Sequence, residues 1–80
     1  MSEESLSTLD LVLGAFKAAL GVDLRPEDDF FEAGGDSVTA EAVLMQLEEA
    51  TGLTLPGWML LDNPTAARVA SLLDEGQQIW

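Results

Sequence analysis

The stretch DFFEAGGDSV, residues 29–38, marks the point at which a long loop turns into a helix. Gly34 and Gly35 allow a tight backbone path with positive φ, and Asp36 is a residue type that caps helices. Ser37 then lies in the first helical turn with its hydroxyl exposed. A helix N-terminus presents unpaired N–H groups and a partial positive charge, which suit an anionic phosphate ester. Ser37 is therefore a candidate site for a phosphodiester-linked group, although an ordinary first-turn serine gives the same pattern.

The loop that precedes this helix, residues 21–36, is long for so small a domain, and such loops are usually functional. Phe30 and Phe31 are too bulky to remain loose, so at least one of them is expected to fill the core. Phe31 is the first candidate and Phe30 the second. Val22 and Leu24 are expected to be further apolar anchors of the same loop.

Outside the loop, apolar residues recur at helical spacing and predict an all-α, four-helix bundle. The first helix is expected over residues 7–20, with Ser7 and Asp10 forming a capping box and Gly21 as its stop. The second is expected to begin at Asp36 or Ser37 and to run to Thr51. The residues expected on the core faces of the helices are Leu9, Val12, Leu13, Phe16, Leu20, Ala40, Val43, Leu44, Leu47, Ala50, Ala66, Val69, Ala70 and Leu73.

The last third of the chain contains a connector and two further helices. Residues 53–57 predict a short extended connector, and residues 58–61 are enough for about one turn of a short third helix. Asn63 is expected to be the N-cap of the last helix, with Pro64 at its first position. Gly76 is expected to end that helix.

Length and charge restrict the function further. Eighty residues make one domain, expected over residues 5–75, with flexible ends at 1–4 and 76–80. Fifteen carboxylates against three basic residues give a net charge of −12. That charge disfavours binding to nucleic acid or to an anionic membrane and favours basic protein partners. No signal peptide or membrane-spanning run is visible, so residence in the cytoplasm is expected. The protein is also expected to be a monomer.

The chain contains no histidine, cysteine or tyrosine. A serine nucleophile needs an adjacent general base, usually histidine or a perturbed lysine. Lys17 is the sole lysine and lies on a different predicted helix, so no enzymatic activity is expected. An EF-hand calcium loop also fails, because Arg25 or Phe31 falls where an oxygen ligand is required. No metal site is expected.

Residues 29–38 resemble the phosphopantetheine attachment motif of acyl and peptidyl carrier proteins. The apolar positions of residues 40–47 resemble the second helix of that family, LTLP at 53–56 resembles its connector, and DNPT at 62–65 resembles the start of its fourth helix. The resemblance covers roughly residues 5–75. The Gly-Gly-Asp-Ser form and the Asn-Pro-Thr turn are more similar to nonribosomal peptide and polyketide carriers than to fatty-acid carriers.

The resemblance implies a carrier that tethers acyl or aminoacyl intermediates as thioesters on a 4′-phosphopantetheine arm attached to Ser37. A phosphopantetheinyl transferase would attach the arm from coenzyme A with Mg²⁺. A loading ligase, adenylation enzyme or acyltransferase would then supply the cargo. Condensing or tailoring enzymes of polyketide or nonribosomal peptide biosynthesis would use it. The absence of cysteine fits, because the cofactor brings the thiol.

One alternative is a non-covalent interaction module of the same fold that lacks the arm. The presence of Ser37 argues against it, since such a module needs no serine there. The sequence does not identify the cargo. Met1 and the short flanks favour a free-standing protein over a piece of a larger assembly line.

The outer face of the second helix is predicted to be the surface that partner proteins contact. At about 100° per residue, Val38, Ala42, Met45 and Glu49 lie opposite the core stripe. An apolar strip with a charged rim is typical of a binding site. Alternatively, the loop or the third helix covers Val38 and Met45. The residues predicted to bind partners are Asp36, Val38, Glu41, Met45, Glu48, Trp58 and Met59.

Overall fold

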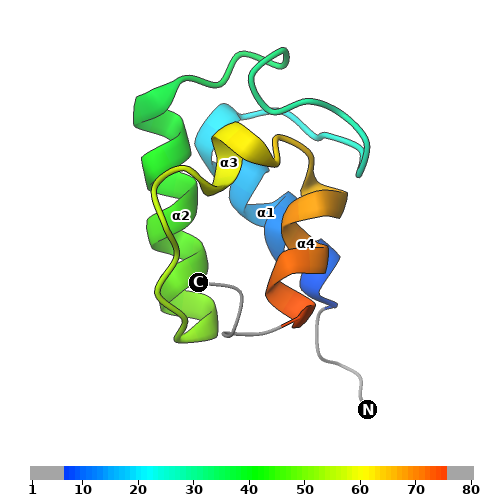
Figure 1. The fold of residues 1–80 in the computed structure, drawn as a ribbon. Coiled ribbons are helices and arrows are strands. Elements are labelled where there is room, and N and C mark those ends of the chain that lie inside the picture. Colours follow the sequence, from blue (N-terminus) through cyan, green and yellow to red (C-terminus); the bar gives the residue numbers. More distant parts are fainter. Residues whose placement is uncertain (1–6, 76–80) are drawn as a thin grey trace.

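The computed structural model describes residues 7–75, which form a bundle of helices (Figure 1). The helices are α1 (Thr8–Leu20), α2 (Ser37–Thr51), α3 (Met59–Asp62) and α4 (Ala66–Glu75). α1 packs against both α2 and α4. The prediction of an all-α, four-helix bundle with a short third helix is confirmed. The ends 1–4 and 76–80, expected to be flexible, and the expected stop at Gly76 lie outside the described residues.

The boundaries of α1 and α2 follow from local sequence. The Ser7 hydroxyl accepts a hydrogen bond from Asp10 N at 3.1 Å, which satisfies one of the free N–H groups of the first turn of α1. Gly21 follows α1 and Gly52 follows α2 as C-caps, and each donates its N–H to the carbonyl four residues earlier. These boundaries agree with the sequence predictions. None of the four helices has the length and hydropathy that a membrane span requires.

The start of α4 differs from the prediction. α4 begins at Ala66, and the Thr65 hydroxyl accepts from Arg68 N at 3.3 Å, so Thr65 takes the capping role expected of Asn63. Asn63 is buried at the end of α3 instead. Its Nδ2 donates to Met59 O at 3.0 Å, and its Oδ1 accepts from Arg68 at 3.4 Å. Burial of the amide is tolerated because both of its polar ends have partners.

The core joins all four helices and both long connections. Phe30 from the loop is completely buried, whereas Phe31 is only half-buried, so the preference for Phe31 as the core anchor is wrong and the second candidate is the correct one. Val22 and Ala50 are exposed, contrary to expectation. Ala50 lies at the edge of the apolar stripe of α2, about 80° from Ala40. The largest fully buried side chains are Phe16, Phe30, Leu47, Met59, Leu60, Val12, Val43 and Val69.

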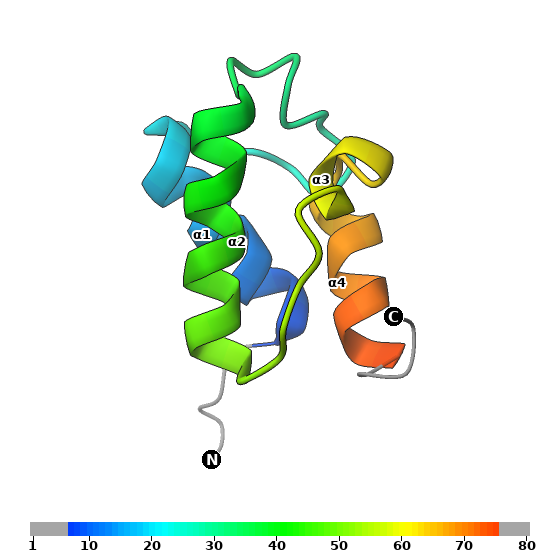
Figure 2. The same cartoon turned by 60° about the vertical axis from the view of Figure 1, so that its left-hand side comes forward.

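The loop 21–36 crosses one end of the bundle between α1 and α2 (Figure 1). It is hydrogen-bonded to the beginning of α4: Phe30 N donates to Pro64 O at 2.8 Å, and Ala67 N donates to Pro26 O at 3.0 Å. The connector 52–58 runs in the opposite direction to α2, back towards α3 (Figure 2). The loop therefore brings a segment far from α4 in the sequence into contact with its first turn.

Candidate functional site

Ser37 is the first residue of α2, and the cap before it is formed by side chains on both sides. Asp36 Oδ1 accepts from Thr39 N at 2.9 Å, and Thr39 Oγ1 accepts from Asp36 N at 2.8 Å, so that the two residues form a reciprocal capping box. Asp36 was predicted to be a cap from the sequence, whereas the role of Thr39 was missed. The Thr39 N–H, followed by its hydroxyl, holds the pKa of Asp36 below its ordinary value.

The Ser37 side chain is exposed, and among residues 7–75 it makes no hydrogen bond to another protein group. Its hydroxyl is therefore available for reaction with an external group. The neighbouring carboxylate of Asp36 is already engaged in the cap, which leaves Ser37 at the positive end of the helix dipole. This geometry fits a covalently attached phosphodiester, because the linking oxygen is accessible and the first turn of α2 favours negative charge.

The two glycines before the cap have different roles. Gly34 has φ 114°, a conformation that a residue with a side chain rarely adopts, and the space beside it is open. Gly35 does not have positive φ, so the expectation for that residue is wrong. A Cβ at Gly35 would instead overlap the Phe30 ring and lie 2.8 Å from the Phe30 carbonyl oxygen. Close contact, and not backbone conformation, requires glycine there.

The outer face of α2 carries exposed apolar side chains. Val38 is 76% exposed and Met45 is 61% exposed, so neither the loop nor α3 covers them. Around α3, Trp58 is 48% exposed and Leu61 is 67% exposed. Leu61 was not predicted, although in a single helical turn Leu60 and Leu61 cannot both point inward. These four side chains and Val22 of the loop are the large apolar residues that residues 7–75 leave exposed to solvent.

Two of the predicted partner-binding residues are placed differently. Met59 is completely buried, so its expected place on the surface is wrong. It is the first residue of α3, and the short helix turns it into the core while Trp58 stays outside. Glu48 is half-buried, and its Oε2 accepts from Leu55 N at 2.7 Å. That carboxylate therefore holds the connector against α2.

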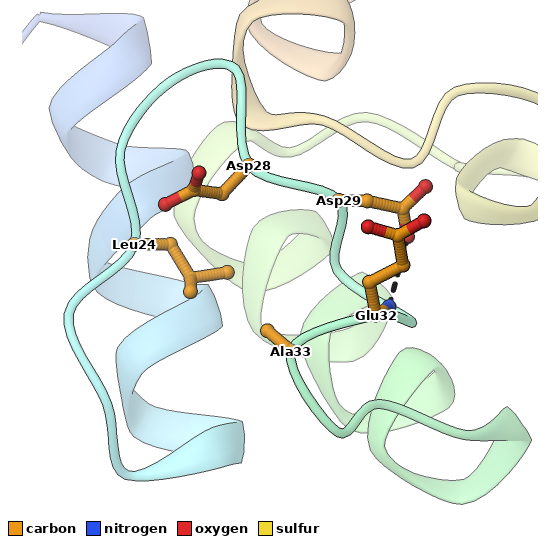
Figure 3. A pocket seen from close by; sticks show the side chains of 5 residues that line it. All are labelled: Leu24, Asp28, Asp29, Glu32 and Ala33. Atoms are coloured by element: carbon orange, nitrogen blue, oxygen red, sulfur yellow. Dashed lines mark hydrogen bonds between the residues drawn. The ribbon is translucent and has the colours of Figure 1, made fainter.

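A shallow hollow of about 220 Å³ lies in the loop, where Leu24 and Ala33 face each other with carboxylates around them (Figure 3). Asp28 accepts from Arg25 N at 2.8 Å, and Asp29 Oδ1 accepts from Phe31 N at 2.8 Å. These carboxylates therefore fold the loop. Within residues 7–75 no group of three or more ligating side chains is arranged to hold a metal ion.

The family described as "Phosphopantetheine attachment site" matches residues 10–73, a range that contains α2 and its cap. The chain belongs to this family. The domain is thus a carrier domain whose cofactor is covalently held 4′-phosphopantetheine, in agreement with the resemblance seen in the sequence.

Proteins similar to this carrier domain are large synthases. It is 39% identical to part of a linear gramicidin synthase of Brevibacillus parabrevis, over 82% of this chain and 1% of that protein. It is 42% identical to part of "Phenolphthiocerol synthesis polyketide synthase type I Pks15/1" of Mycobacterium marinum, over 71% of this chain and 3% of that protein. It is 36% identical to part of "Polyketide synthase GfsB" of Streptomyces halstedii, over 96% of this chain and 1% of that protein. The chain thus spans only 1–3% of the length of these relatives.

Proposed function

We propose that the Ser37 oxygen carries the 4′-phosphopantetheine group and that residues 5–75 are the carrier unit. The observation that supports this assignment most strongly is the exposed hydroxyl directly after the Asp36 cap. The matched range 10–73 contains one other serine, Ser71, which lies within α4 and far from the motif in the sequence. Ser71 lacks the helix N-terminus that favours a phosphate group at Ser37.

In the attachment reaction, Ser37 Oγ forms a bond to the phosphorus that carries the pantetheine group of coenzyme A. The bond from that phosphorus to the oxygen of the nucleotide phosphate breaks, and adenosine 3′,5′-bisphosphate leaves. The hydroxyl proton leaves to a base on the phosphopantetheinyl transferase, because residues 7–75 contain no histidine or cysteine to accept it. Once attached, the cofactor supplies a thiol that holds an acyl or aminoacyl group as a thioester. The protein itself positions the arm and performs no catalysis.

The synthase relatives support a role in polyketide or nonribosomal peptide biosynthesis. We place the domain in the cytoplasm as a monomer. There a phosphopantetheinyl transferase activates it, and a loading ligase, adenylation enzyme or acyltransferase charges it. Condensing or tailoring enzymes then take the cargo.

We further propose that partners contact a docking surface, which consists of Asp36, Val38, Glu41, Met45, Trp58 and Leu61. Its apolar members are exposed, and Glu41 lies beside them on α2. Burial of such side chains slows dissociation, whereas the negative charge of Glu41 accelerates association with a basic partner. Glu48, also predicted here, lies at the edge of this surface. Its bond to Leu55 makes it unsuitable for a test of docking, because its replacement also disturbs the connector.

Intact-mass analysis tests the attachment site. The chain is incubated with coenzyme A, Mg²⁺ and a promiscuous phosphopantetheinyl transferase. We expect one added phosphopantetheine on the parent and on Ser71→Ala, and none on Ser37→Ala. Ser37→Ala should melt as the parent does, because the hydroxyl is exposed. A mass increase that persists in Ser37→Ala would contradict the assignment, and no increase in the parent would favour the non-covalent module.

Kinetics with the transferase tests the docking surface. Met45→Ala should raise the dissociation rate, and Glu41→Lys should lower the association rate more at low salt than at moderate salt. Glu75→Lys at the end of α4 makes the same change of charge away from the surface and serves as the control. Unchanged rates in both test variants, with folding verified, would move the docking surface elsewhere.

A further inference from the structure

The backbone of Gly35 lies directly on Phe30. Gly35 N donates to Phe30 O at 3.0 Å, and a methyl group at Gly35 would overlap two carbons of the phenyl ring. The φ angle of Gly35 is not positive, so its backbone conformation is open to other residues. A side chain at this position therefore requires Phe30 or the backbone beside Gly35 to shift. The contact between Gly35 and Phe30 is here called the Phe30–Gly35 clasp.

The Phe30 side of the clasp is rigid. The ring is completely buried, and its centroid lies 4.8 Å from that of Phe16 on α1 and 5.2 Å from that of Phe31. The Phe30 N–H is fixed to Pro64 O. Because protein interiors are close-packed, the ring has little room to move away from an intruding atom. A side chain at Gly35 must therefore displace the backbone of residues 34–36 rather than Phe30.

The Gly35 side of the clasp leads directly to the modified residue. Asp36 alone separates Gly35 from Ser37, and the capping box with Thr39 leaves Asp36 little freedom. Displacement of Gly35 is thus passed on to the first turn of α2. Gly34 provides the contrast, since the space beside it is open and its replacement acts through backbone strain.

We propose that Gly35 is a positioning residue for the modification of Ser37. Because Gly35 has no side chain, its backbone can lie directly against Phe30. The clasp then fixes the direction in which the Ser37 hydroxyl points away from the helix. This inference rests on the proposed attachment at Ser37. Misplacement of a reacting atom by about 1 Å costs on the order of 10²-fold in rate. The clasp therefore governs how fast a folded domain is modified.

The test compares steady-state modification of Gly35→Ala with that of matched variants, at a temperature where each is folded. Gly35→Ala should lower kcat at least about tenfold and change KM less than about threefold, because the docking surface remains. Gly14→Ala, which meets open space on α1, should match the parent within about twofold. Leu73→Ala, at the far end of α4, provides a destabilised domain with an intact clasp and should also be modified normally.

A second variant separates displacement from general damage. Phe30→Leu in the Gly35→Ala background removes the ring carbons that the methyl group overlaps. This double variant should recover part of the lost kcat despite a smaller core. If Gly35→Ala reacts at the parental kcat, or if Leu73→Ala of equal stability slows equally, the proposal is wrong.

Hydrogen exchange of the parent decides the question if Gly35→Ala does not fold. The Gly35 N–H should then exchange as slowly as amides within α2, because the clasp opens only with the core. Exchange at the rate of an open loop overturns the proposal. Failure of the proposed function gives a different result. In that case the parent gains no mass in the modification assay, whether the Gly35 N–H exchanges slowly or fast.

Discussion

The two connections that flank α2 are held in place in different ways. The loop 21–36, which leads to Ser37, inserts Phe30 into the core and is hydrogen-bonded to the beginning of α4. The connector 52–58 inserts Leu55, and its Leu55 N–H is bound by Glu48 of α2 itself. The entry to α2 thus depends on distant parts of the chain, whereas the exit depends mainly on the helix it leaves. Ser37, the proposed attachment residue, lies at the end that the whole fold determines.

Removal of the entry anchor should have the largest effect. Phe30→Ala should lower the free energy of unfolding by about 3–5 kcal/mol, because a fully buried aromatic ring leaves a large cavity. Phe31→Ala removes the same group from a half-buried position and should cost clearly less. Urea unfolding of both variants measures the difference. Equal midpoints for the two variants would show that Phe30 is not the anchor.

Removal of the exit anchor should have a smaller effect. Leu55→Ala should cost about 2–4 kcal/mol, since it also leaves a cavity but deletes fewer carbon atoms. At a temperature where this variant is folded, the rate of Ser37 modification should remain parental, because the connector does not fix the start of α2. A loss of rate as large as that in a Phe30 variant of the same folded fraction would remove the distinction between the two connections.

Loss of the hydrogen bond between Glu48 and Leu55 N should lower the free energy of unfolding by less than the loss of the Leu55 side chain. Glu48→Ala removes the acceptor of Leu55 N and should cost about 1 kcal/mol. Glu48→Gln keeps an acceptor and should lie between Glu48→Ala and the parent. Glu49→Ala, on the exposed side of the same turn, is the matched control and should change the melting temperature little. Equal losses at Glu48 and Glu49 would mean that the hydrogen bond does not hold the connector.

Replacement of Asp36, the cap at the start of α2, should have the smallest effect on stability, and this effect should depend on pH. The pKa of Asp36 is lower in the folded state, so its stabilising contribution is complete above the ordinary aspartate pKa of about 3.9 and is lost as pH falls through the folded pKa. Asp36→Asn keeps a capping side chain that does not titrate. The difference in melting temperature between the parent and Asp36→Asn should be constant above about pH 5. Below about pH 4, the melting temperature of the parent should fall relative to that of Asp36→Asn. A difference that stays constant down to about pH 2 would contradict the pKa shift.

Features set by neighbouring residues could be predicted from the sequence. The caps at Ser7 and Asp36 and the glycines Gly21 and Gly52 that follow the helices depend on residues within one turn, and all four are found at the predicted positions. The capping box predicted for Ser7 and Asp10 is only half formed, because Ser7 accepts from Asp10 N and the Asp10 side chain makes no return bond within residues 7–75. Ser37 could be proposed from the sequence because its motif is also local, and the structure has its side chain exposed as expected. These features account for α1, α2 and the start of the candidate site.

Features set by packing could not be predicted in the same way. In the pairs Phe30/Phe31 and Trp58/Met59, both residues are apolar and about 100° or more apart, so the path of the backbone decides which one is buried. In the structure, Phe30 and Met59 are the buried members of the two pairs. The role of Gly35 depends likewise on the position of Phe30, which sequence spacing does not reveal.

The hydrogen bonds between the loop and α4 also have a consequence for synthesis on the ribosome. Phe30 N binds Pro64 O and Ala67 N binds Pro26 O, so each bond joins residues from opposite halves of the chain. Translation proceeds from the N-terminus, and α1 and α2 can begin to form as they emerge. The loop finds its partners only when residues 64–67 have left the exit tunnel. The surroundings of Ser37 are therefore complete only after the start of α4 has been made.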